Sequence, residues 1–262
     1  MNRVAYCYLT DFRNDPEMFA WSEASLRHHC GDVDVFVCTA GKRDGAVDIS
    51  GVFRAVYGGD VDPLAKCAGN PAFPLLVFGK FIVGLCPEFA AYDRVVVMDG
   101  DVEVVDPRFA GLGQLAFPGD ADVGLPPRDD MRRAGLAAVK DAAFRRLWSG
   151  AGALYTSAGL VVCRPGGTDR YRRALRTMLA AAQAARLPYP EELSSALYLS
   201  RWILPAQYHF VPSVEDVRNA KELEAAKRRN AFALHYGGPR KRLVADRWRA
   251  RALRYCEGEG AS

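Results

Sequence analysis

Short β-type apolar runs alternate along the chain with segments of helical spacing. The β-type runs cover residues 3–9, 33–38, 94–98, 102–105, 121–125 and 159–163, with short extended pieces over 52–57. Helical spacing of apolar residues covers 18–26, 74–85, 168–186 and 215–229, and a polar, partly helical insert covers 126–152. Strands and helices that alternate in this order are typical of βαβ units. The pattern therefore predicts an α/β fold with a largely parallel central sheet.

Two acidic residues stand directly after the most apolar of these strands. Arg94-Val-Val-Val-Met98 is followed at once by Asp99-Gly100-Asp101. Because ligands of α/β sheets bind outside the carboxyl ends of the strands, we expect chemistry at these two carboxylates. The intervening glycine allows a close approach to the backbone, and two carboxylates can share a hard cation. Acids at a strand end also cap turns, so the motif alone leaves a structural role equally open.

A second polar motif follows a short apolar strand near the C-terminus. Phe232-Ala-Leu leads into His235 and a glycine-rich turn, and Lys241 stands six residues after the histidine. Imidazole suits manganese better than magnesium, and an ammonium group suits phosphate. A single histidine in such a position is also often structural. The remaining histidines lack this context and are expected to be structural: His28, His29 and His209.

The composition excludes several classes of protein. Of the 262 residues, 50% are hydrophobic, which excludes a disordered or fibrous chain, and a net charge of +4 is too small to indicate nucleic-acid binding. The 7 cysteines are odd in number and scattered, which excludes a disulfide framework or zinc knuckle and predicts reduced core residues. No secretory leader opens the chain, and no apolar run approaches the roughly 20 residues that span a bilayer. A cytoplasmic location is therefore expected.

The last stretch of the chain, residues 243–262, is basic and amphipathic. Four arginines alternate with apolar side chains between Leu243 and Tyr255, against the single acid Asp246. Such a segment is either a solvated closing helix or an attachment to an anionic membrane surface or a partner.

Two of the motifs described above match a family signature in order and separation. Residues 95–104, Val-Val-Val-Met-Asp-Gly-Asp-Val-Glu-Val, resemble the strand and D-x-D of the retaining glycosyltransferases of family 8, the group of glycogenin and the bacterial lipooligosaccharide galactosyltransferases. Residues 235–241, His-Tyr-Gly-Gly-Pro-Arg-Lys, resemble the H-F-x-G-x-x-K signature of that family. Other segments are similar to further motifs of the family: Phe78-Gly-Lys-Phe81 with Tyr92-Asp-Arg94, Ala121-Asp-Val-Gly124, and Tyr155-Thr-Ser-Ala-Gly-Leu-Val-Val162. The resemblance therefore spans nearly the whole chain.

The resemblance implies a single GT-A domain over residues 1–262, with a mixed, mostly parallel central sheet flanked by helices. It implies a nucleotide-binding half over 1–125, an acceptor and sugar half over 126–242, and the basic segment 243–262. The implied reaction is metal-dependent, retaining transfer of a hexose from a nucleotide sugar, usually a UDP-sugar, with Mn²⁺ or Mg²⁺ as cofactor. The acceptor is a glycan, lipid or protein, contacted by loops within 126–152 and 187–204, and peripheral membrane contact would come from the basic segment.

The resemblance also implies roles for individual residues. The implied metal ligands are Asp99, Asp101 and His235, with Asp99 also near the ribose, and the implied diphosphate contacts are Lys80 and Lys241. The remaining donor contacts would come from Tyr6, Thr10, Asp11, Gly100, Ser157 and Gly238, with Asp122 near the donor sugar. In this chemistry the cation and the lysines stabilise the charge that grows on the leaving diphosphate, in place of a general acid.

The chain departs from the family in one acidic segment. Relatives show D-Q-x-x-L-N where this chain has Pro190-Glu191-Glu192-Leu-Ser194-Ser195. Glu191 or Glu192 is expected to take the place of the motif acid and to face the oxocarbenium-like sugar as the catalytic residue. Both glutamates also suit the first turn of a helix after Pro190, so a structural role stays open. If neither acts, the catalytic acid is expected at Asp122 or within residues 128–130.

Two other functions fit parts of this pattern. A non-catalytic nucleotide-sugar-binding protein of the same fold would explain the altered acidic segment. A phosphatase of the haloacid dehalogenase type also has an apolar strand followed by D-x-D. Its motif, however, normally lies near the chain start and has Thr or Val where this chain has Glu103.

Overall fold

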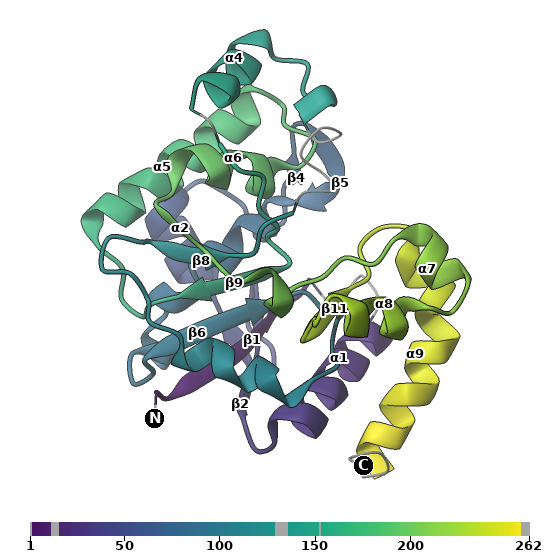
Figure 1. Ribbon diagram of the computed structural model, residues 1–262. Helices are drawn as coiled ribbons and strands as arrows, with labels where there is room; N and C mark the ends of the chain where they lie inside the picture. Colours follow the sequence, from purple (N-terminus) through teal and green to yellow (C-terminus); the bar gives the residue numbers. More distant parts are fainter. Residues whose placement is uncertain (1, 12–15, 129–135, 152, 258–262) are drawn as a thin grey trace.

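The computed structural model describes residues 2–11, 16–128, 136–151 and 153–257. Within these residues the centre is a seven-stranded sheet with the strand order β10-β8-β9-β6-β1-β2-β3 (Figure 1). The strands are β1 Val4–Leu9, β2 Asp34–Thr39, β3 Ala46–Asp48, β6 Arg94–Met98, β8 Val123–Leu125, β9 Leu160–Cys163 and β10 Arg201–Ile203. β9 runs antiparallel to β6 and β8, and the other neighbouring pairs are parallel. The expected mixed, mostly parallel sheet is confirmed.

Helices cover both faces of the sheet, so alternate strand residues pack into two cores. The helices are α1 Pro16–Cys30, α2 Ser50–Tyr57, α4 Ala142–Gly150, α5 Asp169–Ala184, α6 Pro190–Tyr198, α7 Val214–Arg218, α8 Glu222–Arg228 and α9 Arg240–Glu257. On one face, Cys7 of β1 joins a core that includes side chains of α2 and α5. On the other face, Tyr8 joins a core with Leu26 of α1 and Phe109 of the 3₁₀ segment η4 (Pro107–Gln114). Burial on both faces explains why β1 and β6 read as nearly unbroken apolar runs.

One segment expected to be extended is helical. Residues 52–57 lie in α2, where Phe53, Val56 and Tyr57 are buried at spacings of three and four residues. That spacing places the three side chains on one face of a helix. The prediction of an extended piece is therefore wrong, because a short apolar run fits either element until its partners are known.

Two segments expected to be continuous helices are interrupted. In the segment 74–85, Pro74 ends β5 and is followed by two 3₁₀ segments, η1 Leu75–Phe81 and η2 Val83–Leu85. Gly79 of η1 packs so tightly that an added Cβ would lie 2.8 Å from Ile49 Cδ1. Residues 215–229 form α7 and α8, which are separated where Ala220 adopts a positive φ of 57°. A right-handed α-helix does not contain that backbone conformation.

A two-stranded sheet joins the end of the D-x-D segment to the C-terminal part of the chain. β7 Val102–Val104 pairs antiparallel with β11 Ala233–His235, and His235 lies opposite Val102. α9 then packs against α1 and α7. The remaining short elements are β4 Lys66–Cys67, β5 Asn70–Pro74, η3 Pro87–Phe89 and η6 Ala206–Tyr208.

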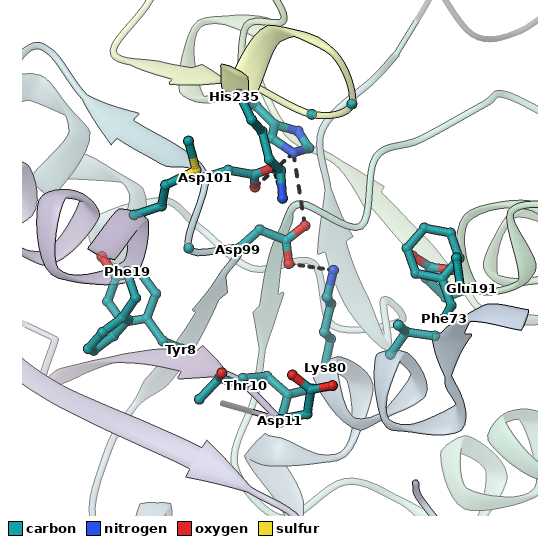
Figure 2. Close-up of a pocket in the computed structure, with 18 of the residues that line it drawn as sticks. Tyr8, Thr10, Asp11, Phe19, Phe73, Lys80, Asp99, Asp101, Glu191 and His235 are labelled. Carbon is teal, nitrogen blue, oxygen red and sulfur yellow. Dashed lines mark ion pairs between the residues drawn. The ribbon is translucent and has the colours of Figure 1, made fainter. Parts of the chain in front are cut away.

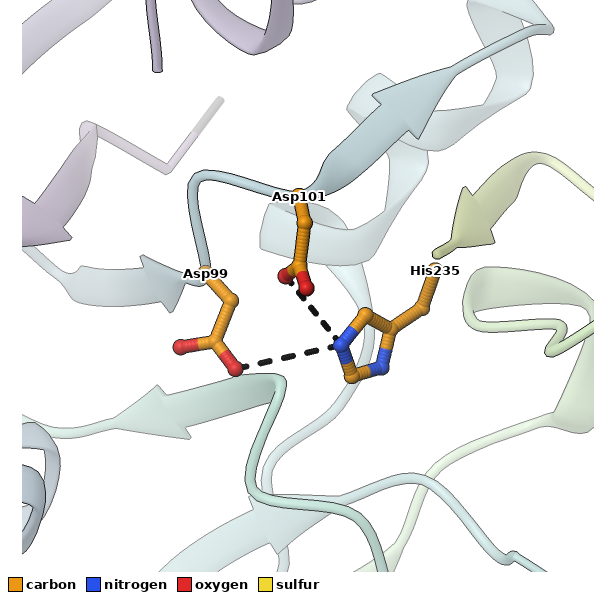
Figure 3. Close-up of side chains that lie close together, drawn as sticks. All are labelled: Asp99, Asp101 and His235. Carbon is orange, nitrogen blue, oxygen red and sulfur yellow. Dashed lines mark ion pairs between the residues drawn. The ribbon is translucent and has the colours of Figure 1, made fainter. Parts of the chain in front are cut away.

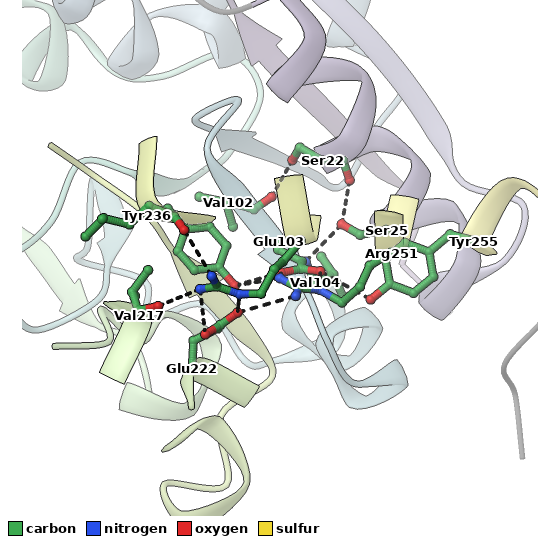
Figure 4. Close-up of polar contacts among 12 residues, drawn as sticks. Ser22, Ser25, Val102, Glu103, Val104, Val217, Glu222, Tyr236, Arg251 and Tyr255 are labelled. Carbon is green, nitrogen blue, oxygen red and sulfur yellow. Dashed lines mark hydrogen bonds and ion pairs between the residues drawn. The ribbon is translucent and has the colours of Figure 1, made fainter. Parts of the chain in front are cut away.

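Buried charges fasten α9 to β7 (Figure 4). Glu103 of β7 is fully buried and accepts hydrogen bonds from Arg251 at 2.8 and 2.7 Å, Tyr236 at 2.7 Å and Tyr255 at 3.2 Å. Glu222 of α8 pairs with Arg247 at 3.1 Å and with Arg251 at 3.4 Å. Two arginines of the basic C-terminal segment are therefore paired with buried glutamates, Arg251 inside the protein and Arg247 with a side chain that is 35% exposed.

Two expectations from the sequence concerned the cysteines and the absence of a membrane-spanning segment. All seven cysteines are free; five are buried, Cys30 is partly buried and Cys256 is exposed. Cys256 therefore departs from the expected core position. Along the described part of the chain, every helix is too short or too polar to cross a lipid bilayer.

Candidate active site

A cavity of about 920 Å³ opens at the carboxyl ends of β1 and β6 (Figure 2). Its lining includes residues 8–11 at the end of β1, residues 99–101 after β6, and residues 237–242, which form a turn and the start of α9. η1 and the first turn of α6 contribute the opposite wall. The cavity has the volume of a small-molecule site and lies at the edge where α/β sheets bind ligands.

Three side chains that suit a metal ion converge in this cavity. Ligand atoms of Asp99, Asp101 and His235 all lie within 4.8 Å of one another (Figure 3). His235 Nε2 is 3.2 Å from Asp101 Oδ1 and 4.0 Å from Asp99 Oδ2. The pairing of β11 with β7 brings the histidine to the acids, because Tyr236 N–H donates to the Asp101 carbonyl at 2.9 Å. Two carboxylates and one imidazole fit a divalent cation such as Mn²⁺.

Gly159 leaves the space that His235 occupies. A Cβ at Gly159 would lie 2.7 Å from both Cε1 and Nδ1 of His235, closer than real Cβ contacts allow. The carbonyl of Gly159 also accepts a hydrogen bond from the Asp99 backbone N–H at 2.9 Å. Gly159, the residue before β9, therefore holds the segment of Asp99 and makes room for the ring of His235.

Two lysines pair with the two acids. Lys80 Nζ lies 2.5 Å from Asp99 Oδ1, and Lys241 Nζ lies 3.0 Å from Asp101 Oδ2. Burial alone would raise the pKa of Asp101, but His235 and Lys241 outweigh it and hold that pKa well below its usual range. Burial alone would lower the pKa of Lys80, but Asp99 and the α6 glutamates outweigh it and raise that pKa above its ordinary value. Asp101 and Lys80 are therefore both charged at neutral pH.

The two neighbouring glutamates of α6 have different surroundings. Glu191 lines the cavity, and its buried Oε2 accepts no hydrogen bond from any described residue. Burial raises the pKa of Glu191 to about 7, although the Lys80 ammonium group opposes the shift. Figure 2 shows Glu191 beside Phe73, on the wall opposite Tyr8 and Thr10. Glu191 is thus the glutamate with free capacity to act on a ligand.

Glu192 is held by several donors at the same time. Its carboxylate accepts hydrogen bonds from Arg128 at 3.0 Å, the Tyr155 hydroxyl at 2.5 Å, the Ser157 hydroxyl at 3.3 Å and the Ala158 N–H at 3.3 Å. Although Glu192 also touches the cavity, these bonds leave it little freedom to act on a ligand. Ser157 does not line the cavity, and its hydroxyl is connected to the site by the hydrogen bond that it donates to Glu192.

The structure brings most, but not all, of the other expected residues to the cavity. Thr10, Asp11, Gly100 and Gly238 line it. Tyr6 does not, because it lies mid-strand in β1 and packs into the core against Phe109. Asp122 is also absent from the lining, because Arg170 at 2.8 Å and the Ser200 N–H at 2.9 Å hold its carboxylate. Of the alternative loop, Arg128 lines the cavity, and residues 129–130 lie outside the described part of the chain.

Several lining residues were missed from the sequence. Tyr8 lies two positions after Tyr6 on the same face of β1 and reaches the cavity, with Phe19 of α1 packed edge-on at 4.8 Å. The period-two alternation of a strand could have suggested Tyr8, which is nearer the carboxyl end. Phe73 and Tyr189 line the wall beside Glu191. His209, expected to be structural, lies 3.0 Å behind His235.

Comparison with solved structures identifies the fold as that of the GT-A glycosyltransferases. The structure matches the galactosyltransferase LgtC, solved with donor and acceptor sugar analogues, with a TM-score of 0.58 and 16% identity over 97% of this chain and 94% of LgtC. It matches mouse xyloside xylosyltransferase 1 with a TM-score of 0.56 and 9% identity over 90% of this chain and 97% of that chain. The bifunctional glycosyltransferase WbbM matches with a TM-score of 0.58 and 12% identity, over 97% of this chain and 52% of WbbM.

These similarities confirm the predicted fold. The sequence itself matches no protein-family model and no curated protein. At such low identities a common fold does not establish a common reaction. The reaction has to be argued from the residues of the site.

Proposed function

We propose that this protein is a metal-dependent, retaining glycosyltransferase. It would move a hexose from a nucleotide sugar, with a UDP-sugar as the expected donor, to a glycan, lipid or protein acceptor. The observation that carries this proposal is the convergence of Asp99, Asp101 and His235 with Lys80 and Lys241 in one cavity. A nucleotide sugar needs this combination, because its diphosphate binds both a divalent cation and ammonium groups.

The three ligands suit Mn²⁺ or Mg²⁺, and the imidazole favours Mn²⁺. When bound, the cation would stabilise the negative charge that develops on the leaving diphosphate. The residues fit the ion, because Asp101 stays ionised despite its burial and His235 directs Nε2 toward both carboxylates.

The two lysines would exchange partners when the donor binds. Lys80 and Lys241 now neutralise the same carboxylates that would hold the cation. A cation at those carboxylates would compete with both ammonium groups and turn them toward the diphosphate oxygens. Lys241 would move further than Lys80, because the Lys241 side chain is 34% exposed and the Lys80 side chain is 9% exposed.

Residues at the end of β1 would hold the nucleoside. Tyr8, Thr10 and Asp11 line the cavity together with Phe19, and these residues offer an aromatic surface and polar groups. The donor sugar would then lie between the metal ligands and α6. We propose that residues 1–125 mainly hold the nucleotide and residues 126–242 mainly the sugar and acceptor, with His235 and Lys241 of the second half at the cation and the diphosphate.

Glu191 is the proposed catalytic residue, and Glu192 supports it. The free carboxylate oxygen of Glu191 could face the sugar and stabilise positive charge on the ring during transfer. Glu192 would instead fix the position of α6 against Arg128 and Tyr155. The acceptor would enter along the wall that carries Phe73 and Tyr189.

The basic segment 243–262 is proposed as a peripheral membrane contact at the cytoplasmic face. α9 leaves Leu243, Arg249 and Leu253 exposed, although Arg247 and Arg251 are internally paired. The seven free thiols fit a reducing compartment. Co-sedimentation with anionic but not neutral vesicles is the expected result, and equal binding to both would contradict this part of the proposal.

Donor hydrolysis tests the main proposal. The purified protein is incubated with a panel of nucleotide sugars in Mn²⁺ or in chelator, and free sugar and nucleoside diphosphate are measured. Release of both products with Mn²⁺, and of neither with chelator, is expected. Binding without release would favour the non-catalytic nucleotide-sugar-binding protein. Release of phosphate from a phosphomonoester would favour the phosphatase.

A further inference from the structure

His209 stands directly behind His235, on the side away from the two acids. The two rings are 4.8 Å apart between centroids, and His209 Nε2 lies 3.0 Å from His235 Nδ1. His209 is 4% exposed. Backbone bonds keep the two residues adjacent, because Phe210 N–H donates to the Ala233 carbonyl and His235 N–H donates to the Phe210 carbonyl.

The tautomer of His235 decides whether it can bind a cation. A neutral imidazole has one N–H donor and one acceptor nitrogen. Nε2 of His235 faces Asp99 and Asp101, so Nε2 must carry the lone pair and Nδ1 the proton for metal binding. The partner of that Nδ1 proton is His209 Nε2 at 3.0 Å. The opposite tautomer would place a proton on His235 Nε2, where it blocks a metal bond.

The other contacts of His209 leave its Nε2 to His235. The Ser157 hydroxyl, 3.5 Å from His209 Nε2, has a single proton and a carboxylate acceptor in Glu192 at 3.3 Å. His209 Nδ1 is buried and has no hydrogen-bond partner among the described residues. When His209 Nε2 accepts, the single ring proton of neutral His209 lies on Nδ1, so the bond to His235 has to outweigh a buried N–H group without a partner. Here the engaged ring nitrogen is the one that faces His235.

Both rings lie against the same glycine, which fixes their relative position. A Cβ at Gly159 would lie 2.7 Å from His235 Nδ1 and 3.0 Å from His209 Nε2. We propose that His209 is a positioning residue that accepts the Nδ1 proton of His235 and thereby fixes its ring and tautomer for a divalent cation. This inference rests on the metal site of the proposed function. It extends that site by a residue that does not itself touch the cation.

The experiment compares two amides at position 209. In His209→Gln the amide reaches about as far as Nε2 and can accept the proton of His235. In His209→Asn the amide reaches only as far as Nδ1. Binding of Mn²⁺ alone is measured by electron paramagnetic resonance, and the nitrogen coupling of bound Mn²⁺ reports the coordinated imidazole. His28→Asn is the matched control, because His28 contacts the rings of His29 and Tyr255 away from the cavity.

The asparagine variant is expected to bind Mn²⁺ about 10- to 100-fold more weakly and to lose the nitrogen coupling. The glutamine variant and the control should stay close to wild type in both measurements. Equal affinity of wild type and His209→Asn would overturn the inference and leave the metal site standing. Equal weakening in both amides would also overturn it, because ring volume would then be what matters. Failure of the wild type to bind Mn²⁺ would overturn the proposed metal site and this inference together.

Discussion

Asp101 and Glu103 lie two positions apart in the chain, but their surroundings are opposite. Glu103 accepts four hydrogen bonds from two buried side chains and the partly buried Tyr255, and its main partner, Arg251, has a side chain that is 9% exposed (Figure 4). Asp101 lines the cavity beside His235 (Figure 3), and its lysine partner, Lys241, is 34% exposed. A buried acid whose hydrogen-bond partners cannot move away has no free oxygen with which to bind a ligand. Asp101 can still bind a ligand, because its partner Lys241 can move away from it.

The difference shows that burial of charge does not by itself mark a functional site. Both acids are nearly inaccessible, at 5% exposure for Asp101 and 0% for Glu103. What separates them is the freedom of the groups around them. Variants of the two acids should therefore give different results. A change at Asp101 should reduce activity, and a change at Glu103 should reduce the stability of the fold.

The largest effect is expected for Asp101→Asn. Turnover should fall by about 10³-fold or more, the upper range for removal of one electrostatic contact in a transition state, because the cation loses a charged ligand. Product release at saturating donor and Mn²⁺ is the measurement. Asp60→Asn, a change of the same kind at an exposed acid, should leave turnover unchanged. Chelator-insensitive turnover in the wild type would contradict the assignment.

Glu103→Gln should act on stability instead. The free energy of unfolding should fall by about 3 kcal/mol, the low end for breaking a buried ion pair, because Glu222 still faces Arg251 at 3.4 Å. Urea unfolding followed by circular dichroism measures the change. Glu224→Gln removes a surface pair with Arg228 at 3.9 Å and should have little effect. Equal stability of the two variants would show that the buried network does not hold α9.

Glu191→Gln should lower the turnover number by at least about 10²-fold while nucleoside diphosphate affinity stays largely intact. The reason is that Glu191 lines the cavity, has a carboxylate oxygen without a hydrogen-bond donor among the described residues, and would act on the sugar and not on the nucleotide. Single-turnover kinetics with the identified donor, together with calorimetry of the free nucleotide, separate the two effects. Turnover at the wild-type rate would redirect the search for the catalytic acid to residues 128–130.

The raised pKa of Glu191 also predicts a pH dependence of stability. Burial raises this pKa from 4.5 to about 7, so the folded protein binds more protons than the unfolded chain between these values. Wild type should therefore lose on the order of 1–3 kcal/mol of stability relative to Glu191→Gln as the pH rises from about 4.5 to 7. Unfolding curves of both proteins across that range test this, and a constant difference would contradict it.

The smallest effect is expected for Lys241→Ala. Donor and free nucleoside diphosphate should both bind about 10-fold more weakly, which corresponds to about 1.4 kcal/mol for one exchangeable cationic contact. Lys66→Ala, at an exposed lysine of β4, is the control. Unchanged affinity for both ligands would show that Lys241, at the start of α9, has only a structural role.

The sequence predicted those parts of the fold and site that depend on a local pattern of residues. The apolar run before Asp99 identified a buried strand, and the resemblance of the segment at His235 suggested that it belongs to the same site. Glu191 and Glu192 could not be separated, because neighbouring helix residues point about 100° apart and only packing decides which one faces the cavity. His209 carries no local pattern, since its role depends on a contact with a residue 26 positions away. Tyr6 and Tyr8 share one face, and only the depth of the strand end distinguishes them.

The pairing of β7 with β11 also determines when the site can come into existence. It joins segments so distant in sequence that the Tyr236–Glu103 hydrogen bond closes a separation of 133 residues. Contacts across such long loops form slowly and late, because closure entropy must be overcome before they give any stability. During synthesis on the ribosome, Asp99 and Asp101 are made long before His235 and before α9, which follows it in the chain. A newly made chain would therefore gain the proposed cation site only late in folding, and a fragment without its C-terminal portion would lack His235 as the third proposed ligand.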